Sequence, residues 1–398
     1  MKIQASSAAA LKLALHKASK CIENKPSMAI LANVLLTQRR DGDGKFFFIS
    51  ATSDSQLTIP APFSIVEGKY SKDIVLPVAM LTSFIGTLPG DCVVTFDISE
   101  DSQDFTIEYC TGDGENVKTG KVSLGYDKAD DFPLARKIGD GYTEVVFPMS
   151  VFKSVLGNAG KFVAADELRP VMNCLCIDVT EDFSEAVFVA SDGHKLFKQI
   201  HPNKPEQGGS DFYRQGAAMK ILVHSQYLKV LSVFEDCEDI NIQCDGKMVR
   251  FASGDIEYVC TLVDGKYPNY NSVIPKDTPC YAVCNKRELL SIIKRISLFS
   301  SESSKLISMK KDGMFLDISA QDIDFSVSGE DQVLVTDSEC PEGFLIGFSW
   351  LTLMDSVNAI PTENVRLNFI DKSRAITVTE DNPASKVTTL VMPMLLND

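Results

Sequence analysis

The chain has 398 residues, 44% hydrophobic and 23% charged, a globular composition that excludes a disordered or collagen-like protein. No apolar run reaches the roughly 18 to 20 residues that cross a bilayer, and the N-terminus lacks the apolar stretch of a secretory signal. The formal net charge of −15, averaged over the whole chain, argues against a nucleic-acid-binding protein, because phosphate would be repelled.

The predicted elements recur three times in the same order: a helix, strands, a second helix and further strands. The first helices are expected at 7–20, 148–162 and 285–299, each beginning near a Ser, Pro or Asn. The second helices are expected at 81–88, 227–234 and 351–360. Strands are expected at 144–147, 172–179 and 375–379. This order predicts an α+β fold of three repeated domains, each an antiparallel sheet with two helices.

Short markers support the repeat. The sequences ISATSDSQL, VASDGHKL and ISAQDID place Asp54, Asp192 and Asp322 at corresponding positions after a strand. The triplets 122–124 and 260–262 correspond in the same way, and each precedes an aromatic residue followed by Pro. We therefore predict domains at 1–138, 139–275 and 276–398, each of about 130 residues.

Basic residues are concentrated on the helices. The six predicted helices carry ten Lys or Arg against two acids, a balance of +8 that leaves −23 for the rest of the chain. Lys12, His16 and Lys20 share one helix face, and so do Arg287 and Lys294. This segregation favours a phosphate-facing surface over ordinary solvated helix faces.

Several motifs resemble chemical sites without meeting their requirements. The eleven cysteines include no Cys-x-x-Cys pair, which favours free thiols in a reducing cytoplasm over a metal site. The segment 114–121 resembles a phosphate loop but has one residue too many between its glycines, so we interpret it as a hairpin loop. Ser191, Asp192 and His194 are neighbours in sequence, and neighbours seldom form a hydrolytic triad. We therefore predict no catalytic residue, metal or cofactor.

The C-terminal stretch 390–396 is unusually apolar for a chain end. It is either a buried last strand or one wall of a groove for a partner, since methionine suits adaptable binding surfaces. The residues by themselves favour the buried strand.

Four phrases together resemble the bacterial sliding clamp family, the beta subunit of the replicative DNA polymerase III. They are LRPVMN at 168–173, SDGHKL at 191–196, LVDGKYPNY at 262–270 and VMPM at 391–394. The resemblance covers essentially the whole chain. It implies a head-to-tail homodimer in which two chains of three domains close a ring around duplex DNA, with helices lining the hole. The family is non-catalytic and cytoplasmic, tethers the polymerase's catalytic subunit, and is opened by a separate ATP-driven loader.

The resemblance also implies the site residues. A cleft for apolar partner peptides would be lined by Met172, Ser191, Gly193, His194, Lys195, Leu196, Pro268, Val273, Leu390, Val391, Met392, Pro393 and Met394. The DNA-facing residues would be Lys12, Lys17, Lys20, Lys25, Lys153, Lys161, Lys229, Lys286, Arg287, Lys294 and Arg295. The dimer interface would set Leu298 and Phe299 of one copy against Val122 and Leu124 of the other.

The sequence departs from the family pattern at four positions: Ala29 replaces an expected Pro, Ser272 a basic residue, and Lys195 and Leu395 a common Arg. The main alternative is a repeat scaffold whose acidic surface binds basic proteins and never DNA. An enzyme is the third reading, which a bound metal or nucleotide would revive.

Overall fold

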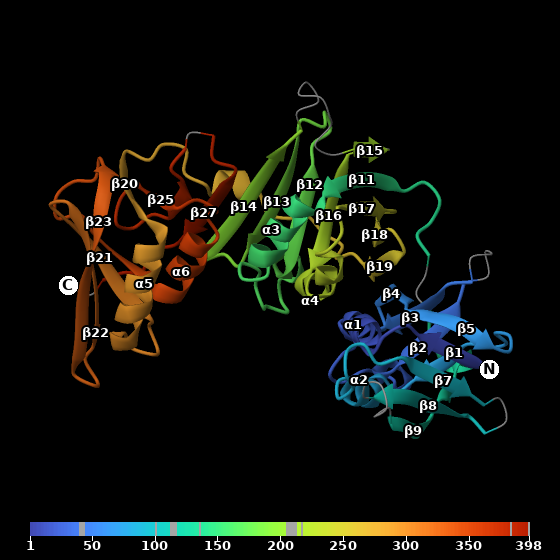
Figure 1. The fold of residues 1–398 in the computed structure, drawn as a ribbon. Helices are drawn as coiled ribbons and strands as arrows, with labels where there is room; N and C mark the ends of the chain where they lie inside the picture. Colours follow the sequence, from blue (N-terminus) through green and yellow to red (C-terminus); the bar gives the residue numbers. More distant parts are fainter. Residues whose placement is uncertain are drawn as a thin grey trace. The chain divides into compact units, whose positions relative to one another are not determined.

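The structure is a computed structural model that describes residues 1–39, 44–99, 102–111, 118–134, 137–203, 213–215, 218–382 and 384–396. Its strands pair in antiparallel ladders and its helices pack against them, so the predicted α+β class is confirmed (Figure 1). Chain contacts define two compact units, and the middle repeat contributes to both. Residues 1–150, β15 (Tyr213–Gln215) and 229–262 form the first unit, and the other described residues form the second. The three domain boundaries stay a prediction.

The same order of elements recurs along the chain. The first third contains β1 (Lys2–Ala5), α1 (Ala8–Ser19), β2 (Val34–Gln38), β3 (Phe46–Ala51), β4 (Ser55–Ala61), β5 (Phe63–Glu67), β6 (Ile74–Leu76), α2 (Val78–Ile85), β7 (Val94–Ile98), β8 (Asp104–Thr111), β9 (Lys118–Gly125) and β10 (Asp127–Lys128). The middle third contains β11 (Thr143–Pro148), α3 (Met149–Ala159), β12 (Cys174–Val179), β13 (Glu185–Ser191), β14 (Lys195–Pro202), β15, β16 (Met219–His224), α4 (Ser225–Leu228), β17 (Asp239–Cys244), β18 (Met248–Ser253) and β19 (Ile256–Thr261).

The last third contains β20 (Cys280–Asn285), α5 (Lys286–Ile296), β21 (Leu306–Asp312), β22 (Phe315–Asp322), β23 (Val327–Ser338), β24 (Leu345–Ser349), α6 (Trp350–Asn358), β25 (Asn364–Phe369), β26 (Ile376–Glu380) and β27 (Val387–Val391). The first helix of each repeat lies where the sequence predicts it. The second helix of the middle repeat does not: α4 is a single turn, followed by the 3-10 helix η6 (Val230–Phe234). Four of the five residues of η6 are buried, more than one face of an α-helix would bury.

Two strand pairs join successive repeats. In the first unit, β4 pairs with β19 within the sheet order β10-β6-β2-β3-β4-β19-β18-β17-β11-β15. In the second unit, β14 pairs with β27 within the order β16-β12-β13-β14-β27-β26-β25-β20-β23-β22-β21-β24. The remaining sheet has the order β5-β1-β7-β8-β9, so β9 lies at its edge. Thus the same kind of junction occurs twice within one chain.

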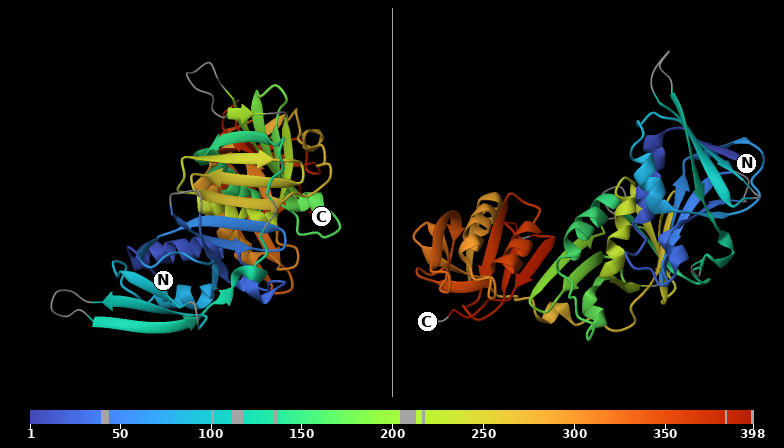
Figure 2. Two further views of the ribbon diagram at one scale, coloured as in Figure 1. Left: turned by 90° about the vertical axis from the view of Figure 1, so that its right-hand side faces the viewer. Right: turned by 90° about the horizontal axis from the view of Figure 1, so that it is seen from below.

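Apolar helix faces hold the helices on their sheets. α1 packs against β3 and β4 through Leu11 and Leu15, which are fully buried. α5 packs against β22 and β23 through Leu289 and Ile293, and it lies beside α6 (Figure 2). Each such side chain contributes roughly 1.5–3 kcal/mol by leaving water. The side chain of Asn285 caps α5 by accepting hydrogen bonds from two backbone N–H groups of its first turn.

The turn after the second strand of each hairpin is the most exactly repeated feature. Thr52, Asp192 and Asp322 each accept hydrogen bonds at their side-chain oxygen from the backbone N–H groups two and three residues ahead. The sequence alignment of Asp54 with Asp192 is therefore wrong by two residues, because Thr52 makes the equivalent turn. A threonine hydroxyl and an aspartate carboxylate both accept the hydrogen bonds that hold this turn. Residue identity alone therefore does not show that the two positions are equivalent.

Candidate functional site

The junction of β14 and β27 brings many of the predicted cleft residues together. Leu196 pairs with Leu390 across the two strands, and both belong to one buried apolar cluster that also contains Cys176 and Val189. His194 accepts a hydrogen bond at its backbone oxygen from the N–H of Met392, 2.8 Å away. The cleft's two predicted walls, SDGH and VMPM, are thus neighbours in space.

The turn before β14 is held by its own hydrogen bonds. Ser191 donates its hydroxyl to the carbonyl of Lys195 at 2.9 Å and accepts from the N–H of Gly193 at 3.2 Å. Gly193 has φ +92°, a conformation that other residues rarely adopt. The Asp192 carboxylate accepts from two backbone N–H groups, including that of His194 at 2.7 Å. Asp192 therefore builds a turn, and the resemblance to a hydrolytic triad is not supported by this geometry.

Lys195 is placed differently from its neighbours. Strand alternation puts its side chain on the face of β14 opposite to Leu196. Its Nζ lies 2.5 Å from Asp355 Oδ2 of α6 and 5.3 Å from the centre of the Phe162 ring. Val391, the partner of Lys195 across the ladder, shares that face. Lys195 thus contacts the helix layer rather than the apolar cluster.

The other predicted cleft residues differ in exposure. Met172 is buried in the 3-10 helix η4 (Pro170–Asn173), so the strand expected from 172 begins only at Cys174. Pro268, Val273 and Met392 are exposed. Pro393 is half-buried, and Met394 forms an isolated bridge with Gly347 beside β24. Leu390 and Val391 thus belong to a buried last strand, as one reading of the C-terminal stretch predicts, and Met392 follows this strand at the surface. The groove for a partner stays a prediction.

Sequence reasoning missed part of the apolar cluster. Tyr267 is buried in it, and Val171, Tyr270 and Ile274 pack partly exposed against it. Tyr267 carried a signal, because it occupies the aromatic position of the repeated marker before Pro. Phe132, its counterpart in the first repeat, is buried in a similar cluster with Leu35 and Val75.

Two basic residues of α5 and one that follows α3 line the same cavity of the second unit. Lys161, Arg287 and Lys294 line a space of about 550 Å³, together with Met354 and Asp355 of α6. Three cations and one carboxylate line this cavity, so its lining carries a net positive charge. Of the other predicted DNA-facing residues, Lys12, Lys25, Lys153 and Lys229 are exposed.

The remaining predicted DNA-facing residues have partners within the protein. Lys17 pairs with Asp236 at 3.1 Å, and Lys20 donates to the hydroxyl of Ser232 at 2.7 Å. Lys286 donates to a backbone carbonyl, and burial lowers its pKa. Arg295 pairs with Asp331 of β23 and, by hydrogen bonding, holds the pKa of that carboxyl below its ordinary value.

The residues expected at a dimer interface lie on two edges. Val122 and Leu124 are half-buried on β9, which pairs on one side with β8. Leu298 is 79% exposed in the 3-10 helix η8 (Ser297–Phe299). The ring of Phe299 covers Gly329 so closely that a Cβ there would lie 2.6 Å from it. Val122 and Leu124 thus lie on the edge strand β9, and Leu298 and Phe299 lie beside β23.

Other candidate sites receive no support from the described part of the chain. The eleven cysteines are all free thiols, ten of them at least half-buried and Cys110 exposed. Burial raises the pKa of Cys174 and Cys176 to about 12, so neither thiol is activated. Among the described residues, no group of three or more His, Cys, Asp or Glu could hold a metal, and no helix could span a membrane. The core of the phosphate-loop look-alike, 112–117, lies outside the described residues; β8 and β9 flank it.

Comparison with known proteins agrees with this geometry. The family described as DNA polymerase III beta subunit, C-terminal domain, matches residues 271–395. Proteins named beta sliding clamp from Synechocystis sp. and Pseudomonas aeruginosa are 23% and 24% identical, covering 97% of this chain and 97% and 98% of theirs. The crystal structure of a sliding clamp from Pseudomonas aeruginosa bound to griselimycin is 21% identical and has a TM-score of 0.83 over all of both chains. The clamp from Bacillus subtilis, 20% identical, has a TM-score of 0.81.

These matches define the class of protein. Its fold is that of solved structures of sliding clamps, the beta subunit of DNA polymerase III. Residues 271–395 match the model of the C-terminal domain of the DNA polymerase III beta subunit, and along nearly its whole length the chain is similar to proteins named beta sliding clamp.

Proposed function

We propose that this chain is a DNA sliding clamp: two copies join head to tail into a ring around duplex DNA and tether the replicative polymerase and other DNA-processing proteins. The observation that carries the proposal is the agreement of fold along the whole chain with known clamps. The tether acts through effective concentration, because a polymerase that releases the template remains beside it. The proposal assigns no catalytic step to the chain itself.

The cavity lined by Lys161, Arg287 and Lys294 supports a DNA-facing helix layer. Contacts from lysine and arginine to phosphate are blind to sequence and screened by water and salt, so they permit sliding. We extend the same role to the exposed Lys12, Lys25, Lys153 and Lys229. Lys17, Lys20, Lys286 and Arg295 contribute charge to this layer while also making contacts within the protein.

The apolar cluster around Leu196 and Leu390 supports a peptide cleft at the junction of β14 and β27. A partner peptide that buries two apolar side chains there gains roughly 3–6 kcal/mol from area removed from water. After the entropy cost of binding, this suits exchange among the polymerase, a clamp loader and other partners. We propose that the peptide lies against Leu196, Leu390 and Met392, and that Lys195 supports the cleft from behind. The free thiols support a reducing cytoplasm as its compartment.

Charge reversal at the basic cavity tests the DNA contact. Arg287→Glu with Lys294→Glu should weaken retention on DNA and lower the slope of log affinity against log salt by about two. The readout is salt-dependent binding to a duplex without free ends. The matched control, Arg374→Glu, changes an exposed arginine of a turn that pairs with Asp371.

The control should keep both its retention and its salt slope. Equal retention by the doubly reversed variant and the unsubstituted chain would contradict the DNA-facing assignment. Absence of DNA retention in the unsubstituted chain as well would favour a scaffold that binds basic proteins.

A further inference from the structure

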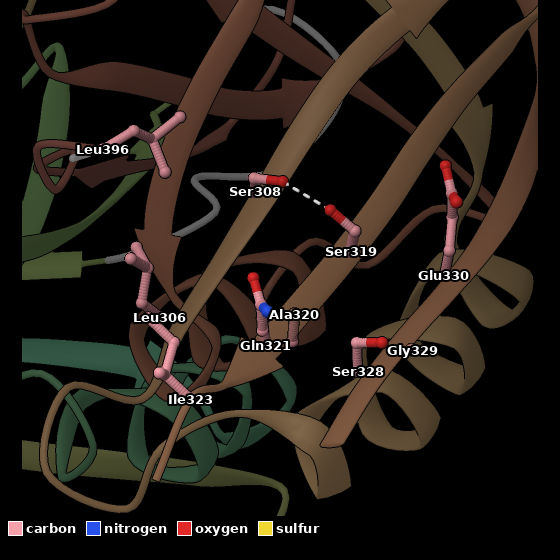
Figure 3. A pocket seen from close by; sticks show the side chains of 10 residues that line it. All are labelled: Leu306, Ser308, Ser319, Ala320, Gln321, Ile323, Ser328, Gly329, Glu330 and Leu396. Carbon is pink, nitrogen blue, oxygen red and sulfur yellow. Dashed lines mark hydrogen bonds between the residues drawn. The ribbon is translucent and has the colours of Figure 1, made fainter. Parts of the chain in front are cut away.

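The sheet of the last repeat bears a polar pocket on its face away from α5. The pocket has a volume of about 480 Å³, and the hydroxyls of Ser308 and Ser319 lie 2.7 Å apart on it (Figure 3). Gly329, which the ring of Phe299 covers, also lines this pocket, so the pocket adjoins the predicted dimer interface. Lys311, three residues beyond Ser308 on β21, faces the other way by strand alternation and is buried. The opposite face of the sheet thus carries a buried cation.

Two cysteine thiols lie beside this cation. Cys280 is the first residue of β20, and Cys340 follows the end of β23 by two residues. Cys280 and Lys311 both act electrostatically on the thiol of Cys340, so the three groups are close together. Both thiols are free in the structure.

The ladder between β20 and β23 sets the two cysteines opposite one another. One residue beyond the last pair of this ladder, the N–H of Glu339 donates to the carbonyl of Tyr281 at 3.1 Å. Continuing the antiparallel count by one residue on each strand brings Cys280 opposite Cys340. Direct partners in such a ladder have Cα atoms about 4.5–5.5 Å apart, within the range of about 4.4–6.8 Å that a disulfide spans. The backbone therefore holds the two thiols at disulfide spacing.

The turn after Cys340 packs against the same strands. Cys280 pairs on its other side with Phe369 of β25. The centre of the Phe369 ring lies 5.2 Å from that of Phe344, whose N–H donates to the carbonyl of Pro341 at 3.2 Å. The segment that begins at Cys340 thus returns to the strand pair that contains Cys280, which keeps the two cysteines together.

Exposure distinguishes this pair from the other neighbouring cysteines. Cys280 and Cys340 are both half-buried, so a small oxidant can reach them from solvent. Cys174 and Cys176 are neighbours on one strand, but both are buried. Cys92 is also buried, and its thiol donates to a backbone carbonyl of β8 at 2.9 Å. Neither of these two sites combines exposure with thiols that face each other across a ladder.

We propose that Cys280 and Cys340 form a disulfide when a low-molecular-weight disulfide, such as oxidised glutathione, oxidises the chain. The Cys280 thiolate attacks one sulfur of oxidised glutathione, a mixed disulfide forms and one glutathione thiolate leaves. Cys340 then loses its proton and attacks the Cys280 sulfur, which releases the second glutathione. The protons of the two cysteines pass through water to the two leaving thiolates. Two protein thiols are thus oxidised, and one external disulfide is reduced to two thiols.

The surroundings of Cys340 set the order of attack. Burial, followed by the charges of Cys280 and Glu342, raises the pKa of the Cys340 thiol to about 11, and the Lys311 ammonium opposes this shift. At neutral pH Cys340 is therefore almost entirely protonated, which assigns the first attack to Cys280. Deprotonation of Cys340 limits the second step, so closure of the disulfide should become faster as the pH rises from neutral toward about 11.

The bond would join the start of β20 to the segment after β23 and would enclose α5, β21 and β22 within one covalent loop. In a reducing compartment the pair stays open, and oxidation closes it. The oxidised chain should unfold at a higher urea concentration than the reduced chain, because the cross-link restricts the unfolded state. This expectation requires neither DNA nor a partner, so it is independent of the proposed clamp function.

Mass spectrometry of the full chain tests the pair in a Cys110→Ser background, which removes the exposed thiol. Oxidised glutathione, followed by alkylation and digestion without reductant, should give one peptide pair joined through Cys280 and Cys340. Cys340→Ser should instead raise the glutathione adduct on Cys280 at least about tenfold, because the resolving thiol is absent. Cys237→Ser, the matched control at another half-buried thiol, should leave the cross-link unchanged.

Two further variants separate pairing from effects on folding. Cys340→Ala, which introduces no hydroxyl, should give the same adduct on Cys280 as Cys340→Ser. Cys280→Ser should remove both the cross-link and the difference in urea unfolding between the oxidised and reduced chains. Equal adducts on Cys280 with and without the Cys340 thiol, or complete alkylation of both thiols after oxidation, would overturn the proposal.

Discussion

At the scale of single residues, Lys195 and Asp355 form an ion pair that is nearly enclosed by protein. Their side chains are 9% and 18% exposed, and the pair joins β14 to α6. Sequence similarity predicts a residue of the peptide cleft here. The side chain faces the opposite way because alternation along β14 sends Leu196 to one face and Lys195 to the other. No single-sequence pattern carries that information, since it depends on where the turn before β14 ends.

The enclosed pair should respond strongly to the loss of one partner. Lys195→Met leaves the Asp355 carboxylate without its cation and should lower the free energy of unfolding by about 3–5 kcal/mol. Lys195→Met combined with Asp355→Leu should cost less than the single change, because no buried charge remains. Denaturant unfolding measures both.

The exposed pair of Lys220 and Asp178 provides the comparison, since its nitrogen–oxygen distance of 2.6 Å is nearly the same. Lys220→Met should cost about 0–1 kcal/mol, because water screens this pair. If Lys195→Met cost no more than Lys220→Met, the enclosed pair would have no structural role.

At the scale of elements, the sequence predicts the first helix of each repeat, most clearly α5, whose apolar residues recur at helical spacing. It predicts the turn before β14, because Asp-Gly is a turn signal. It does not predict the pairing of β14 with β27, which depends on residues almost two hundred positions apart. The residues of β27 that we propose for the cleft were therefore predicted only from the resemblance. Tyr270 and Ile274 were not predicted, because no local pattern shows that they pack against the cluster that contains Leu390.

The exposed methionine at the end of β27 tests the cleft. Met392→Asp places a charge where Met392 is 42% exposed, beside His194, and should weaken binding of a peptide with two adjacent large apolar side chains by at least about tenfold. Fluorescence anisotropy of the labelled peptide measures the change.

Met80→Asp, the same substitution at an exposed methionine of α2, should leave peptide binding unchanged. Equal affinity for the two variants would mean that the peptide does not contact Met392. Both variants should keep the melting temperature of the unsubstituted chain, since both side chains are exposed.

At the scale of the whole molecule, net charge alone points in the wrong direction. The chain carries −15, yet Lys161, Arg287 and Lys294 meet at one cavity. An acidic remainder discourages adhesion of DNA elsewhere, while a local excess of cations attracts phosphate. The charge of separate elements is therefore the informative quantity. The sequence alone overestimates the excess of positive charge on the helices, because Lys17 and Arg295 are partly neutralised by Asp236 and Asp331.

The central claim, that two copies encircle DNA, is tested most directly by release on cutting the DNA. The dimer, with a mass near twice 43.7 kDa, is assembled on a closed circular duplex, and retention is followed by gel filtration before and after a single cut. The account predicts retention on the circle and loss from the linear form, restored by bulky blocks at both ends. Equal retention on the circle and on the unblocked linear duplex would contradict encirclement.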